Sequence, residues 1–150
     1  MKKDLTKGIF EANVDDMNPQ FFDYCMELLF KAGAVDVFLE RIQMKKNRPG
    51  FLLKAIAPWN KREKIIAVIL RETTTLGVRY HRIDRVVLTR KMKIVSTKAG
   101  KVPVKIATDQ KLKIKKFIPE YEICRQIAKK KNLPLREVYE SVIRACHNQN

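Results

Sequence analysis

The sequence is poor in histidine and cysteine and has no long apolar run, and each shortage excludes a class of protein. His81 and His147 are the only histidines and form no ligand-spaced metal cluster. The three cysteines lack a CxxC spacing and are odd in number, which favours reduced thiols over a disulfide framework or a zinc site. No apolar run approaches the ~20 residues of a membrane-spanning helix, and the first residues lead into no signal-peptide core. We therefore expect a cytoplasmic protein without a membrane anchor.

Positive charge is what the sequence has in excess. Its 150 residues include 32 Lys+Arg against 16 Asp+Glu, a net charge of +16. Residues 81–150 carry 18 basic and 6 acidic side chains, whereas residues 1–80 carry 14 and 10. Such a balance favours a polyanionic partner, which could be nucleic acid, a nucleotide or an acidic protein surface. A lysine-rich solvated surface explains the charge equally well.

Hydrophobic periodicity predicts an α+β fold that begins with a ferredoxin-like βαββαβ subdomain. Alternating or apolar segments predict strands over residues 5–14, 35–44 and 51–57, and a fourth strand from Val78. One helix is expected between Pro19 and Gly33. The second is expected from Asn60 to Gly77, with an apolar face of Ile65, Ile66, Ile69, Thr73 and Leu76. This element order is the split βαβ arrangement.

The rest of the chain predicts a β-hairpin around Ala99-Gly100, a further strand in KLKIKKFI, and helices that begin after Pro119 and Pro134. The shift in charge places the boundary between the two parts. We therefore expect a ferredoxin-like subdomain over residues 1–82 and a basic hairpin with C-terminal helices over residues 83–150.

In this fold, three connecting segments should meet at one end of the sheet: residues 14–18, 44–50 and 71–79. The first two predicted strands run the same way and the next two run opposite to them, so these segments share an edge. Their side chains are chemically complementary. We predict divalent-metal ligands at Asp15, Asp16 and Glu11, because Mg²⁺ and Mn²⁺ bind carboxylates plus phosphates. Phosphate-binding cations and hydroxyls are predicted at Lys45, Lys46, Arg48, Arg71, Thr73, Thr74 and Arg79.

Each of these motifs has a structural explanation when taken alone. Asp16 could be an accessory cap of the following helix, KKNRPG could be a solvated hairpin turn, and the TTT run could reflect β-branched residues before a strand. Only their expected convergence favours a binding site. No residue can be assigned a catalytic role from the sequence.

The same segments resemble a known family. EANVDDMNPQFFDYCMELLFKAGAVDVF, MKKNRPG and RETTTLGVR are similar to the C-terminal part of the LarC family, the nickel-insertion proteins of nickel-pincer cofactor synthesis. KVPVKIA and IPEYEICRQIA fit the same pattern, so the resemblance covers residues 9–143. Its motif positions fall on the predicted site residues, from Asp15 and Asp16 to Arg79.

The resemblance implies a CTP-dependent nickel chelatase, a lyase. Such a protein places nickel into pyridinium bis-thiocarboxylate mononucleotide and hydrolyses CTP to CMP and pyrophosphate. It also implies that the C-terminal part binds CTP with Mn²⁺ or Mg²⁺ and that the protein is a homo-oligomer. The family's longer N-terminal portion, with its histidine-rich stretch, has no counterpart in this sequence. We therefore expect nickel to be handled by that portion, on the same longer protein or on a partner chain.

Two other functions remain open. An RNA-binding module of the RRM type shares the βαββαβ order, and IFEANV and RPGFLLKA echo its strand motifs. FLLKAIA, however, lacks the further aromatic residues that would stack on bases. The other possibility is a non-catalytic assembly domain whose basic second half docks to an acidic partner.

Overall fold

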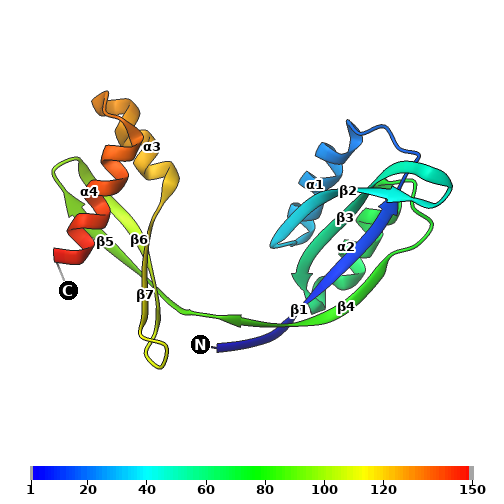
Figure 1. Ribbon diagram of the computed structural model, residues 1–150, viewed down its shortest axis with the longest axis horizontal. Helices are drawn as coiled ribbons and strands as arrows, with labels where there is room; N and C mark the ends of the chain where they lie inside the picture. The colour runs from blue at the N-terminus through cyan, green and yellow to red at the C-terminus, as the bar shows by residue number, and fades with distance from the viewer. Residues whose placement is uncertain (1, 149–150) are drawn as a thin grey trace. The chain divides into compact units, whose positions relative to one another are not determined.

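The computed structural model describes residues 2–148, which divide into two units at Arg85 and Val86, within one strand. The first unit contains two helices and a four-stranded sheet (Figure 1). Its elements are β1 (Lys2–Val14), α1 (Phe21–Ala32), β2 (Asp36–Met44), the 3₁₀ turn η1 (Lys45–Asn47), β3 (Arg48–Pro58), the 3₁₀ turn η2 (Trp59–Lys61), α2 (Arg62–Glu72) and β4 (Arg79–Val87).

The sheet of the first unit has the strand order β2-β3-β1-β4, and β3 is antiparallel to both of its neighbours. This order confirms the predicted ferredoxin-like arrangement. Alternation along the strands creates two different faces. Phe10, Ala12 and Val14 of β1 are buried in a core that also contains residues of α1 and α2, such as Leu29 and Ile65.

The opposite face of this sheet carries the polar residues of the same strands. Glu11 and Asn13 alternate with the buried residues of β1, and Lys54 lies directly across from Glu11 on β3. This face therefore presents charged side chains together with apolar ones such as Phe38, whose ring lies beneath Lys54 Nζ at 5.9 Å from its centroid.

Helix α2 is shorter than predicted, because it ends at Glu72. The Thr73 hydroxyl donates to the Ile69 carbonyl at 2.7 Å and accepts the Thr75 N–H at 3.3 Å. Threonine hydroxyls that bond to nearby backbone groups compete with helix continuation, which explains the early end. The prediction that Leu76 lies on the apolar face of α2 is therefore wrong: Leu76 is fully exposed, at 101% of its reference area.

The second unit has its own antiparallel sheet, in the order β5-β6-β7, and its own core. Its elements are β5 (Thr89–Thr97), β6 (Gly100–Asp109), β7 (Ile114–Pro119), α3 (Tyr121–Lys131) and α4 (Leu135–Asn148). The predicted hairpin is confirmed, with Thr97 paired to Gly100. The core joins the sheet to both helices through Val95, Val102, Val104, Cys124, Val138 and Val142, among others.

The three cysteines are buried, and Cys25 and Cys124 are free thiols. Burial, with a smaller contribution from the charge of Glu72, raises the pKa of Cys25 to about 11. Among residues 2–148, no helix is long and apolar enough to cross a membrane.

Candidate functional site

The three segments predicted to converge do meet at one end of the first sheet. The Arg48 guanidinium donates from Nη1 to Asp15 Oδ2 at 3.3 Å, which joins the β2–β3 turn to the end of β1. The Thr74 hydroxyl donates to Asp16 Oδ1, which joins the loop after α2 to the same end. The structure thus confirms the expected convergence and places cations, carboxylates and hydroxyls together.

Asp15 and Asp16 are adjacent, but they contact different segments. The Asp15 side chain is 17% exposed and faces Arg48, whereas Asp16 is exposed and faces Thr74. Each contact uses one carboxylate oxygen, Oδ2 of Asp15 and Oδ1 of Asp16, so the second oxygen of each can be offered to a cation. Two carboxylates suit a Mg²⁺ or Mn²⁺ ion that takes its other ligands from phosphates and water.

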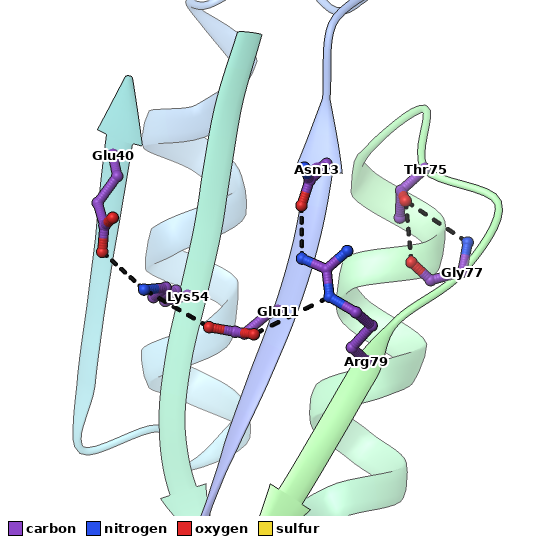
Figure 2. Close-up of polar contacts among 7 residues, drawn as sticks. All are labelled: Glu11, Asn13, Glu40, Lys54, Thr75, Gly77 and Arg79. Carbon is purple, nitrogen blue, oxygen red and sulfur yellow. Dashed lines mark hydrogen bonds and ion pairs between the residues drawn. The ribbon is translucent and has the colours of Figure 1, made fainter. Parts of the chain in front are cut away.

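A chain of ion pairs crosses the open face of the sheet, with one residue from each strand in spatial order (Figure 2). Lys54 Nζ lies 2.8 Å from Glu40 Oε1 and 3.5 Å from Glu11 Oε1. Glu11 Oε2 in turn lies 3.9 Å from Nε of Arg79. The hydrogen bond to Glu40, followed by the charges of Glu40 and Glu11, raises the pKa of Lys54. Glu11 is thus paired with two cationic side chains of the protein, Lys54 and Arg79.

Glu11 is consequently separated from the other two predicted metal ligands. A strand rises ~3.3 Å per residue, so the four residues from Glu11 to Asp15 span about 13 Å. Among residues 2–148, no group of three His, Cys, Asp or Glu side chains is arranged to hold a metal ion. Asp15 and Asp16 thus lie at the end of β1 on contacts to Arg48 and Thr74, whereas Glu11 lies further back along the strand, beside Lys54 and Arg79.

Arg79 is held by two side chains of β1. Its Nη2 donates to Asn13 Oδ1, and its Nε faces Glu11, so two of its five N–H groups have protein partners (Figure 2). The Thr75 hydroxyl donates to the Gly77 carbonyl at 3.0 Å, which gives the loop before Arg79 a defined turn. The remaining N–H groups of the guanidinium can fork onto an anion.

The other predicted residues lie at the edge of this region. Lys45 and Lys46 are exposed on η1, where Lys46 and Asn47 have left-handed backbone angles, with φ of 58° and 57°. Arg71 is exposed in the last turn of α2. Thr73 uses its hydroxyl to end α2, as described above, so its first role is structural.

A cavity of about 550 Å³ opens beside Asp15. It is lined by Val14, Asp15, Met17, Pro19, Arg41, Ile42, Gln43, Pro49, Gly50 and Phe51. Gly50 permits this close approach of β3 to β1, because a Cβ at position 50 would lie 2.8 Å from the Val14 carbonyl oxygen. The carboxylate of Asp15, which pairs with Arg48, forms part of the cavity wall.

Sequence reasoning missed three residues of this region. Asn13 alternates with the buried residues of β1, and that pattern could have placed it on the open face of the sheet. Arg41 and Gln43 were not detectable, because their position depends on the β2–β3 register, in which Arg41 pairs with Phe51 and Gln43 with Pro49.

Comparison with known proteins agrees with the fold and the motifs. A family model described as "Nickel insertion protein" matches residues 2–139. A relative from Dictyoglomus thermophilum is 50% identical over 130 residues, which cover 87% of this chain and 33% of that protein. The pyridinium-3,5-bisthiocarboxylic acid mononucleotide nickel insertion protein of Thermotoga petrophila is 44% identical over 136 residues, covering 91% of this chain and 34% of that protein.

A solved structure is similar over nearly the whole chain. It is the apo form of LarC2, described as the C-terminal domain of a cyclometallase involved in synthesis of the NPN cofactor of lactate racemase. It is 40% identical, with a TM-score of 0.89, and the match covers 97% of this chain and 99% of that one. The chain spans about a third of the length of the curated relatives it matches.

Proposed function

This chain belongs to the nickel insertion protein family, and we propose that it is the part that binds CTP together with Mn²⁺ or Mg²⁺. In this proposal the longer protein inserts nickel into pyridinium bis-thiocarboxylate mononucleotide, and one water is consumed as CTP is hydrolysed to CMP and pyrophosphate. The proposal rests on the family resemblance of the motifs. The observation in the structure that supports it best is the meeting of Asp15, Asp16, Arg48, Thr74 and Arg79 at one end of the sheet.

These residues suit a triphosphate because they combine both signs of charge. Phosphoryl transfer requires positioning and charge stabilisation more than covalent chemistry from the protein. Asp15 and Asp16 would hold the divalent cation, which neutralises phosphate charge when bound. Arg79 would fork onto phosphate oxygens, and Arg48 would provide a second cation close to Asp15. Lys45, Lys46, Arg71, Thr73 and Thr74 would complete the edge of the phosphate site.

Glu11 does not fit the metal site, because its carboxylate faces Lys54 and Arg79. We assign it to the orientation of Arg79 instead. Residues 2–148 contain no three-ligand cluster for nickel. We therefore assign nickel, as cargo, to the rest of the longer protein. The expected partners of this chain are that part of the protein and the mononucleotide. We place the homo-oligomeric protein in the cytoplasm, where reduced cysteines are the rule.

The RRM alternative is disfavoured by the direction of Phe10 and Phe51, the aromatic residues of the two strand motifs that resemble it. Such modules stack bases on aromatic residues of the open sheet face. Phe10 of β1 is completely buried and stacks with Trp59 and Tyr80, while the ring of Phe51 lies edge-on to Phe22. The open face instead carries the ion pairs from Glu40 to Arg79.

A titration of the purified chain with CTP, ATP and a short single-stranded RNA, each with and without Mn²⁺, tests the proposal. We expect binding of CTP that requires Mn²⁺ and exceeds binding of ATP. Tight RNA binding that is independent of metal and falls steeply with salt would favour the RRM alternative. Absence of binding to all three would leave the assembly domain.

A further inference from the structure

A second cavity of the first unit, of about 500 Å³, lies around Trp59 and falls within the size range of ligand pockets. It is lined by Thr6, Pro58, Trp59, Asn60 and Arg82. Trp59 packs on Gly8 of β1, and the seven residues from Gly8 to Asp15 span about 23 Å of strand. The cavity is therefore distinct from the nucleotide site proposed at Asp15.

The indole of Trp59 is held against the sheet in one orientation. A Cβ at Gly8 would lie 2.8 Å from Trp59 Cε3, so the absence of a side chain at Gly8 lets the ring lie this close to β1. Phe10 and Tyr80 pack around the same ring, with centroids 6.5 Å and 5.8 Å away. Trp59 is half-buried, so part of the indole packs on the sheet while another part lines the cavity. The cavity thus has a fixed aromatic wall.

Two guanidinium groups lie over this aromatic wall. The Cζ atom of Arg82 is 4.7 Å from the indole centroid, and that of Arg62 is 5.9 Å away. Arg62 also pairs through Nη2 with the exposed carboxylate of Glu63 at 3.0 Å. A guanidinium that stacks on a ring keeps N–H groups at its own edge, where they can fork onto a carboxylate or a phosphate. The cavity therefore combines an aromatic wall with cations, a combination that suits a flat ring with acidic substituents.

The relative from Thermotoga petrophila is named for a molecule of this chemistry, a pyridinium-3,5-bisthiocarboxylic acid mononucleotide. Its ring is cationic and carries two acid groups. A cationic ring is attracted to the face of an indole, and ionised acid groups pair with guanidinium forks. The ring and its substituents thus match the two features of the Trp59 cavity.

We propose, on the basis of the function proposed above, that the Trp59 cavity binds the pyridinium ring of the mononucleotide. Arg82 pairs with one thiocarboxylate, and Arg62 exchanges the exposed Glu63 for the other. The ring lies against Trp59 and Pro58. Because this cavity is distinct from the CTP site, one chain binds both ligands at the same time.

Fluorescence of Trp59 tests the site directly, because this residue is the only tryptophan of the chain. The probe is N-methylpyridinium-3,5-dicarboxylate, which keeps the ring and two acid groups but has no phosphate. Pyridinium rings quench an excited indole on contact, so we expect quenching that saturates and that is unchanged by Mn²⁺-CTP. Displacement of the probe by CTP would overturn the proposal.

Two simpler compounds separate the contributions of the ring and of the acid groups. N-methylpyridinium lacks the acid groups and should quench only by collision, without saturation. Glutarate has two carboxylates but no ring, and it should not displace the probe at equal concentration. Saturation by N-methylpyridinium equal to that of the probe, or displacement by glutarate, would refute the proposed recognition.

The decisive variant is Arg82→Gln, which removes the cation from an exposed position and keeps a polar side chain. We expect the affinity for the probe to fall roughly 5- to 20-fold, because a charge-assisted fork is lost, while binding of Mn²⁺-CTP stays unchanged. Arg85→Gln is the matched control, since it removes the same charge from the same strand at a residue that pairs with Asp4. It should bind the probe like the parent. An equal loss in both variants would show a general effect of charge and overturn the site.

Failure of this inference and failure of the proposed function give different results. Binding of Mn²⁺-CTP without saturable quenching by the probe refutes the Trp59 site and leaves the nucleotide site in place. Saturable quenching that Arg82→Gln weakens, in a chain that binds no CTP, refutes the nucleotide site and supports the Trp59 cavity.

Discussion

Arg79, the first residue of β4, donates a hydrogen bond from Nη2 to Asn13 Oδ1 on β1. The contact fixes one side of the guanidinium plane and leaves N–H groups for another acceptor. We expect Arg79→Lys to weaken binding of Mn²⁺-CTP by roughly 10- to 100-fold, because one ammonium cannot bond Asn13 and also fork onto phosphate oxygens.

Isothermal titration calorimetry of Arg79→Lys and of Arg85→Lys would measure this effect. Arg85 is the matched control, because it lies on the same strand and pairs with Asp4 at 3.8 Å. Arg85→Lys should bind CTP like the parent. Parent-like binding by Arg79→Lys would show that only its charge matters, and the assignment of Arg79 to phosphate would then be wrong.

Glu11 should act on nucleotide binding through Arg79 and not through the metal. We expect Glu11→Gln to lower CTP affinity about two- to fivefold in the parent, the size typical of a partly exposed ion pair. In the Arg79→Ala background the same change should have no effect. The Mn²⁺ concentration at half-saturation should stay unchanged in Glu11→Gln.

Glu40→Gln is the control for this cycle, since it removes the outer partner of Lys54 and leaves Arg79 in place. It should leave CTP affinity unchanged. An increased Mn²⁺ requirement in Glu11→Gln, equal in both backgrounds, would show instead that Glu11 is a metal ligand.

The sequence predicted the parts of this site that depend on local patterns. Alternation along β1 and the turn signals after each element gave the strand order, and the strand order gave the convergence of Asp15, Arg48 and Thr74. The partners of Glu11 could not be predicted from the sequence, because Lys54 and Arg79 lie beside it only through pairing between strands that are distant in the sequence. The position of Gln43 depends in the same way on hairpin register.

The end of α2 shows a different limit. Helical spacing extends through Thr73 to Leu76, so periodicity alone predicts a longer helix. The choice between helix and turn is made by side-chain hydroxyls that bond to nearby backbone groups. Periodicity detects which positions could be buried, whereas it does not detect this competition.

Gly50 should be intolerant of a side chain, because β3 approaches the end of β1 there. An added Cβ would lie 2.8 Å from the Val14 carbonyl oxygen and 2.7 Å from Met44 Sδ. The methionine can move, but the backbone carbonyl cannot. We expect Gly50→Ala to lower the free energy of unfolding by about 1–3 kcal/mol, measured by urea denaturation.

Gly77→Ala is the matched control, since an added Cβ at Gly77 would meet nothing within 4 Å and the φ of this residue is not positive. It should change the free energy of unfolding by less than about 1 kcal/mol. Equal destabilisation by the two substitutions would contradict the close approach at Gly50.

The two adjacent aspartates give the most direct test of the metal site. Several negative charges of CTP would meet the carboxylates of Asp15 and Asp16, and they repel one another unless a divalent cation lies between them. We expect Asp15→Asn and Asp16→Asn each to abolish the Mn²⁺ requirement for CTP binding and to suppress hydrolysis. Binding without metal should improve slightly, because the repulsion is reduced.

The thermal stability of the two asparagine variants distinguishes a metal-binding role of Asp15 and Asp16 from a role in shaping the turn. Asparagine can still accept the hydrogen bonds from Arg48 and Thr74, and the Asp15–Arg48 pair is partly exposed, so the melting temperature should change little. Asp36→Asn, at the start of β2, is the control for loss of one negative charge. Calorimetric CTP titrations of the three variants, with and without Mn²⁺, decide between the two roles. If both asparagine variants at positions 15 and 16 keep the metal dependence of the parent, the pair only shapes the turn, and the cation must be held elsewhere.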